Sequence, residues 1–270
     1  MSTFLYDLAE GIPSKLTELR FVIGRAKEAF ETDEELYNVL CRYACVLTMT
    51  TLERFLKELQ VSIQSDLNAY ISDFSSMPVG LKREFSRKIV YFEGVAEQEI
   101  QKRATQLIKF FEKNSVRIDM SAFTYKENSN KNPSNASVDS IFFKYGINSI
   151  LHCISGNRFE EIFDNDTATD YLLRRAIKRF RSTLYSFPYR DLEDPYRIVD
   201  WVPVKGVEVP QSLWHTFIEQ IARRRHSVVH ADTTDNPTSW EALRSDSEKL
   251  EVLMNCLLLA ASANIGRDLE

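Results

Sequence analysis

Long stretches of apolar residues at helical spacing are the feature that most constrains how this chain of 270 residues can fold. Apolar side chains recur three or four residues apart through most of the sequence, as in amphipathic helices. The stretches cover about residues 12–31, 33–62, 80–114, 137–154, 167–185, 211–230 and 243–266. Only 8 glycines and 8 prolines are present, which favours long regular elements over loop-rich β structure. We therefore predict an all-α fold, with long helices packed as an antiparallel bundle.

Two segments interrupt the helical pattern and are predicted to be irregular insertions. Residues 115–137 contain a polar, turn-rich run from Lys126 to Asn135. Residues 186–210 hold four prolines and cannot form one helix, although residues 198–209 could make a small hairpin. No repeat or boundary is apparent, so we expect residues 1–270 to form a single domain.

Composition and charge exclude several classes of protein. With 34 basic and 39 acidic residues the net charge is −5, so any RNA binding must depend on local basic clusters. The four cysteines form no CxxC motif and are predicted to be small buried hydrophobes. The N-terminus lacks signal-peptide features, and the most apolar stretch, residues 252–265, is too short to span a bilayer. We expect a cytoplasmic protein with no membrane partner.

The octet from Arg223 to His230, Arg-Arg-Arg-His-Ser-Val-Val-His, is the strongest candidate for chemistry. It holds half of the four histidines beside a run of cations, which should lower the imidazole pKa values and favour a neutral base. Metal-independent RNA cleavage needs one group to accept the 2′-hydroxyl proton and another to protonate the leaving 5′-oxygen; histidine suits both. Arginine suits the phosphoryl charge, because it bonds phosphate bidentately and stays protonated.

The spacing within the octet favours a site shared between two copies of the chain. Arg225 and His230 are five residues apart, which separates them by roughly 140° around a straight helix. Two copies across a two-fold axis would supply two arginines and two histidines to one cleft. His226 and His230, four residues apart, could instead be zinc ligands, but the arginines would repel a dication and a good third ligand is lacking. We expect neither a metal nor a cofactor.

The segment from Arg225 to His230 resembles the signature of the HEPN superfamily, an arginine, a polar residue, a few more residues and a histidine, in an all-α bundle. Arg225, His226 and His230 match its three fixed positions, and the early helix around Glu53 resembles the acidic early helix of HEPN proteins. The subgroup that this chain most resembles is the RiboL-PSP-like type. Residues 186–210 have no counterpart in the common core.

The resemblance implies a homodimeric, metal-independent endoribonuclease that leaves 2′,3′-cyclic phosphate ends on a substrate such as tRNA or mRNA. It implies that His230 is the general acid or base, that Arg225 stabilises the transition state and that His226 assists. Many such proteins are toxins or effectors of bacterial anti-phage defence, which implies an antitoxin or another defence-system partner. The tyrosine of the AMPylated toxin subgroup is absent after His230, so no nucleotidyltransferase antitoxin is expected.

Other residues are weaker candidates, each with a structural alternative. Glu53 could orient the motif arginine or only pair with Lys57, and Arg224 could support the site. A basic helical segment could follow the RNA backbone together with Arg223, or be a solvated helix face. This segment contains Arg174, Arg175, Lys178, Arg179 and Arg181.

Two further function classes stay open at the level of sequence. One is a catalytically inactive HEPN module that binds a nucleotide or a partner protein, which the net acidic charge favours. The other is a helical interaction scaffold in which the histidines are incidental.

Overall fold

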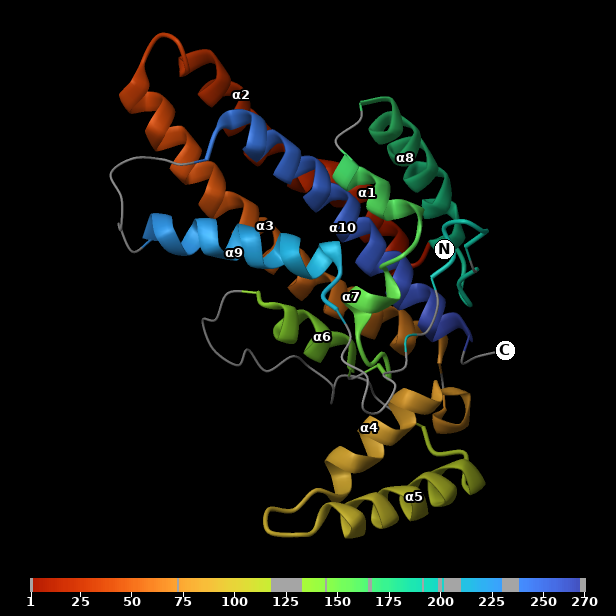
Figure 1. Cartoon of the computed structure of the whole chain (residues 1–270). Coiled ribbons are helices and arrows are strands. Elements are labelled where there is room, and N and C mark those ends of the chain that lie inside the picture. Colours follow the sequence, from red (N-terminus) through yellow and green to blue (C-terminus); the bar gives the residue numbers. More distant parts are fainter. Residues whose placement is uncertain are drawn as a thin grey trace.

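The computed structural model describes residues 2–71, 73–117, 133–143, 145–164, 167–190, 192–198, 201, 210–229 and 238–267. Figure 1 shows an all-α molecule, and β-type pairing in the described residues is limited to an isolated bridge between Asp73 and Arg117. The longer helices are α1 (Phe4–Lys15), α2 (Thr17–Ala29), α3 (Glu34–Tyr70), α4 (Val79–Val90), α5 (Glu97–Lys113), α6 (Asn135–Phe143), α8 (Thr167–Phe180), α9 (Leu213–Val229) and α10 (Trp240–Arg267). Shorter elements are α7 (Ile150–Cys153) and the 3₁₀ helices η1 (Phe74–Ser76), η3 (Arg158–Asp164) and η4 (Arg181–Leu184). The predicted fold class is confirmed.

Helix α10 forms the centre of the molecule, with α1, α2, α3, α7 and α8 packed around it. Every residue from Val252 to Ile265 is buried, so this part of the helix has no solvent-facing side. Its polar side chains bond to nearby groups. The Asn255 amide donates to the Glu251 carbonyl at 2.7 Å, and its oxygen accepts from Nε of Arg181 at 3.3 Å. The apolar run that is too short for a membrane is thus the core of the bundle.

The first helices differ in detail from the prediction of one helix over residues 12–31. Helix α1 begins earlier, at Phe4, and Pro13 lies in its last turn. Asp66, fully buried on α3, accepts backbone hydrogen bonds from Phe4 (2.7 Å) and Leu5 (3.0 Å), which satisfies free N–H groups at the start of α1. Asp33 caps α3, since its side chain accepts a hydrogen bond from the Leu36 N–H at 2.9 Å.

The prediction of a single long helix over residues 80–114 is wrong. The chain instead forms the hairpin of α4 and α5, which projects from one end of the bundle in Figure 1. Gly94, in the connection, has φ +83°, a backbone conformation that an α-helix cannot contain. The helix predicted over residues 137–154 is likewise divided, into α6 and α7, by a turn at Gly146 with φ +87°.

The two predicted insertions are described only in part. Of residues 115–137, positions 118–132 lie outside the described residues, and α6 already begins at Asn135. In residues 186–210, the described positions form no helix, as the prolines require. Most of the hairpin predicted over residues 198–209 lies outside the described residues.

A close backbone contact joins the α4–α5 hairpin to the bundle, and it yields a test of the fold. A Cβ added at Gly80 would lie 2.4 Å from Cα of Gly146. We predict that Gly80→Ala lowers the free energy of unfolding by about 1–3 kcal/mol, the usual cost of overpacking, in urea denaturation. Gly24→Ala is the control: nothing lies within 4 Å of its added Cβ, and alanine favours the helix, so stability should rise by about 0.4–1 kcal/mol. Equal effects of the two substitutions would contradict the contact.

Candidate active site on helix α9

The first part of helix α9 has a stripe of buried apolar side chains, and most of the Arg223–His230 octet follows this stripe on the same helix. Trp214, Phe217, Ile218 and Ile221 are buried at three- and four-residue spacing, and the Trp214 indole donates to the Ile154 carbonyl at 3.1 Å. Continuing the stripe by one more turn places Arg224 and Arg225 on the inner side of the helix. The apolar half of α9 therefore fixes how the arginines are presented.

The side chain of Arg224 points into the bundle and is paired there. Its Nη1 forms an ion pair with Asp246 of α10, whose side chain is only 6% exposed. Burial lowers the pKa of Arg224, and the thiol of Cys45 on α3 lies close enough for the arginine to oppose the rise that burial causes in the cysteine pKa. Arg224 thus ties the motif end of α9 to α3 and α10.

The neighbouring side chains of the octet point elsewhere. Arg223 is 83% exposed and lies 3.8 Å from Glu219 on its own helix, and His226 is also exposed. Arg225 is half-buried, and among the described residues its guanidinium has no hydrogen-bond or ion-pair partner. Of the three arginines, Arg225 therefore combines partial burial with a charge that no described acidic group neutralises.

His230 lies outside the described residues, as do Ala231 and Asp232. Helix α9 is described to Val229, the residue just before it.

Some residues of the basic segment on α8 are exposed, and others pair with groups of neighbouring helices. Arg175, Lys178 and Arg179 are exposed, although Arg179 also lies 3.6 Å from the exposed carboxylate of Glu193. Tyr171, 66% exposed, shares their side of the helix. Arg174 pairs with Glu248 of α10 at 3.2 Å. The exposed members form a cationic face with an aromatic ring.

Two other residues singled out in the sequence have structural partners. Arg181 is buried, 8% exposed, with its Nε on Asn255 and its Nη1 3.6 Å from Glu10, so it is not part of the exposed basic face. Glu53 pairs with Lys57 at 3.1 Å, and both side chains are about 40% exposed. In the described residues Glu53 has no bond to an arginine of α9.

Sequence reasoning missed Asp246, because nothing in a helical pattern shows which charge a carboxylate will meet. It also gave no role to His152 and His215, whose rings lie 4.5 Å apart, with His152 stacked on Trp201 at 4.4 Å. The Ser212 hydroxyl is 2.7 Å from Nδ1 of His215, and burial and the nearby His152 lower the His215 pKa. These two histidines hold the start of α9 against α7.

Comparison with known families identifies the chain. The model of the family RiboL-PSP-HEPN matches residues 14–261, so the chain belongs to this family within the HEPN superfamily. HEPN domains are ribonuclease-like, commonly bind RNA and commonly dimerise. Neither the comparison with curated proteins nor that with solved structures found a match.

Two kinds of feature are absent from the described residues. They contain no helix that is both long and apolar enough to cross a membrane. They also contain no group of three or more His, Cys, Asp or Glu side chains placed to hold a metal ion.

The Arg224–Asp246 pair gives a prediction for stability. Asp246→Ala should lower the free energy of unfolding by about 3–5 kcal/mol, because it leaves the Arg224 charge partly buried without its partner. Removing both charges together, as Arg224→Met with Asp246→Leu, should cost much less. Chemical denaturation of the two variants measures both effects, and the pair has no such role if the single and double variants are equally destabilised.

Proposed function

We propose that this protein is a metal-independent endoribonuclease whose active site is built from Arg225, His226 and His230. The observation that carries the proposal is the different placement of the three consecutive arginines. Arg224 is taken up by Asp246 and Arg223 projects into solvent beside Glu219, while Arg225 is half-buried and keeps its charge available among the described residues. A cation partly shielded from water interacts more strongly with phosphate than a fully solvated one.

The proposed reaction is an internal transfer at phosphorus. A histidine accepts the proton of the ribose 2′-hydroxyl as its oxygen forms a bond to the adjacent phosphorus. The bond from phosphorus to the 5′-oxygen breaks, and that oxygen receives a proton from a second acid. The products carry a 2′,3′-cyclic phosphate and a 5′-hydroxyl. His230 is assigned one proton transfer, His226 assists, and Arg225 holds the phosphoryl oxygens.

The second acid or base is proposed to come from a partner copy of the chain. On a straight helix Arg225 and His230 would be about 140° apart, too far around the helix for both to face one phosphate. A two-fold axis beside the octet would bring the two sets together. The family resemblance supports this dimer and a role as a toxin or effector in anti-phage defence in the cytoplasm, held in check by an antitoxin or another defence-system partner.

The exposed face of α8 is proposed to hold the substrate strand. Arg175, Lys178 and Arg179 can pair with successive phosphates, and Tyr171 offers a ring on which a base can stack. Arg223 would extend this positive surface toward the octet. The substrate class that these contacts suit is single-stranded RNA, such as a loop of tRNA or a stretch of mRNA.

The cleavage proposal predicts loss of activity on substitution of the motif. In EDTA, the wild-type protein should cut RNA to 2′,3′-cyclic phosphate ends, and Arg225→Ala and His230→Ala should each slow cutting by about 10²–10⁴-fold. Arg103→Ala, an exposed arginine of α5, is the control and should cut normally. Product ends are read by mass spectrometry.

Mixing experiments test the shared site. Co-refolded Arg225→Ala and His230→Ala chains should recover part of the activity, since a mixed dimer holds one intact arginine and one intact histidine. Dependence on added metal, or full activity in His230→Ala, would refute the mechanism. A pure dimer that binds RNA without cutting it would favour the inactive HEPN module.

The proposed substrate face predicts a change in salt dependence. In a His230→Ala background, which prevents cutting, substituting Arg175, Lys178 and Arg179 together by alanine should weaken RNA binding. The slope of log K against log salt should fall by about 2, because each phosphate contact on single-stranded RNA contributes about 0.7. Substituting the exposed α5 residues Lys102, Lys109 and Lys113 changes the net charge equally and should leave the slope almost unchanged. Equal slopes for both triple variants would remove α8 from the interface.

A further inference from the structure

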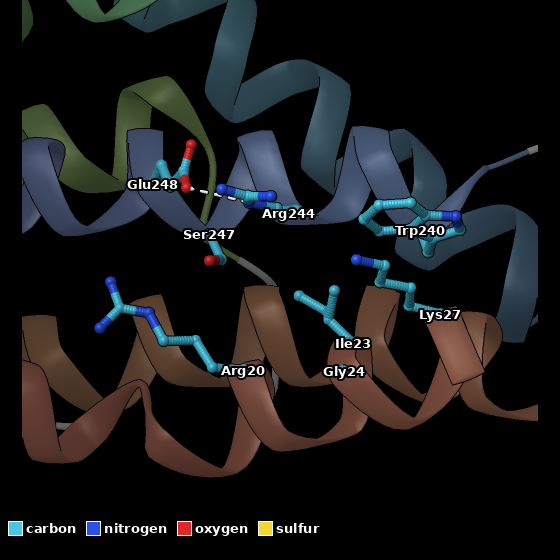
Figure 2. A pocket seen from close by; sticks show the side chains of 8 residues that line it. All are labelled: Arg20, Ile23, Gly24, Lys27, Trp240, Arg244, Ser247 and Glu248. Carbon is cyan, nitrogen blue, oxygen red and sulfur yellow. Dashed lines mark hydrogen bonds and ion pairs between the residues drawn. The ribbon is translucent and has the colours of Figure 1, made fainter. Parts of the chain in front are cut away.

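A groove between α2 and α10 lies apart from the α9 motif. It has a volume of about 220 Å³ and is lined by side chains of both helices (Figure 2). The lining residues are Arg20, Ile23, Gly24, Lys27, Trp240, Arg244, Ser247 and Glu248. Helical geometry places Trp240, Arg244 and Ser247 on one side of α10, and Asp246, the partner of Arg224, on another. The groove is therefore a separate site.

The lining of the groove is positively charged in an acidic protein. It holds three cations and one carboxylate, whereas the whole chain has a net charge of −5. Arg20 is paired with Glu251 at 2.6 Å and Arg244 with Glu248 at 3.3 Å. Glu248 is shared with Arg174 of α8, so its charge is divided between two arginines. The groove therefore favours an anionic ligand.

Two polar groups in the groove have no described acidic or hydrogen-bonding partner. The Lys27 ammonium lies 5.0 Å from the centre of the Trp240 ring, a cation–π contact, and no described carboxylate pairs with it. Ser247 is only 2% exposed, makes no hydrogen bond with the described residues, and points its hydroxyl into the groove in Figure 2. Because this hydroxyl lines the groove and is not used within the described residues, Ser247 can donate a hydrogen bond to a ligand there.

Gly24 gives the groove its depth. A Cβ built at Gly24 would meet nothing within 4 Å, although the residue lies in the interior of α2. Glycine destabilises a helix interior by about 1 kcal/mol relative to alanine, so open space at this position is kept at a cost to the helix. A larger side chain here would enter the groove.

We infer that this groove binds one nucleotide, with its phosphate between Lys27 and Arg244 above Ser247 and its base against Trp240. An ammonium, a guanidinium and a hydroxyl donor together suit phosphate oxygens, and an indole suits a flat ring. The volume is below the roughly 300–1,000 Å³ of sites for drug-sized ligands, which limits the occupant to a single small unit. The nucleotide is either free in solution or one unit of an RNA strand, and the inference does not depend on cleavage at α9.

The decisive variant is Gly24→Leu, which fills the groove while improving helix propensity. Arg25→Leu is the matched control, because it places the same side chain on the exposed side of the same helix. A third variant, Lys27→Gln, removes only the charge. All three are made in the full chain carrying His230→Ala, so that no probe is cut. Thermal unfolding should show Gly24→Leu to be at least as stable as its parent.

The probes are AMP, UMP, inorganic phosphate and a 2′-O-methyl oligonucleotide, each titrated by calorimetry. We expect the parent to bind nucleotide more tightly than phosphate, with at least tenfold loss in Gly24→Leu and Lys27→Gln and no loss in Arg25→Leu. Loss with the mononucleotides identifies a free ligand, and loss with the oligonucleotide alone identifies a unit of an RNA strand. Binding of every probe that is unchanged by Gly24→Leu, or no binding by the parent, would overturn the inference. RNA cleavage by the unmodified motif is measured separately, so either proposal can fail alone.

Discussion

The burial on all sides of Val252–Ile265 in α10 is the constraint on which the rest of the structure depends. A helix that is apolar around its whole circumference must be surrounded, and here α1, α2, α3, α7 and α8 do this. Its few interior polar groups bond locally, as Asn264 does to the Ala260 carbonyl at 2.7 Å, so the enclosure leaves few unpaired groups. The outer helices are therefore positioned by one shared element.

In its first turns, before the fully buried part begins, α10 contacts three regions: the motif helix α9, the basic helix α8 and the groove against α2. Asp246 holds Arg224 of the motif helix, Glu248 holds Arg174 of the basic helix, and Ser247 forms the floor of the groove against α2. These consecutive positions point in different directions because successive residues are turned by about 100° on a helix. A ligand in the groove would thus contact the element that also anchors α8 and α9.

Much of the fold could be predicted from the sequence, because long periodic segments determine helices directly. The pattern failed where an apolar spacing continued through a break, as at Gly94, whose positive φ is a property of the backbone and not of hydrophobicity. For the candidate site, the sequence could predict which residues take part but not which partners their side chains meet. Arg181 bonds to Asn255 and Arg224 pairs with Asp246. Both contacts depend on which helices pack together, and the spacing of apolar residues within a helix does not specify this.

The run of three arginines illustrates why adjacent residues of one type need not share a role. Arg224 is turned into the bundle and stabilises it, whereas Arg223 is turned into solvent. Arg225 continues the buried stripe of α9 beyond its last buried apolar residue, Ile221, so its charge lies at the edge of the core. An unneutralised cation at such an edge is better stabilised by an anion brought to it than by water alone. In the proposed function this anion is a phosphate of bound RNA, whose oxygens can accept two parallel hydrogen bonds from a planar guanidinium.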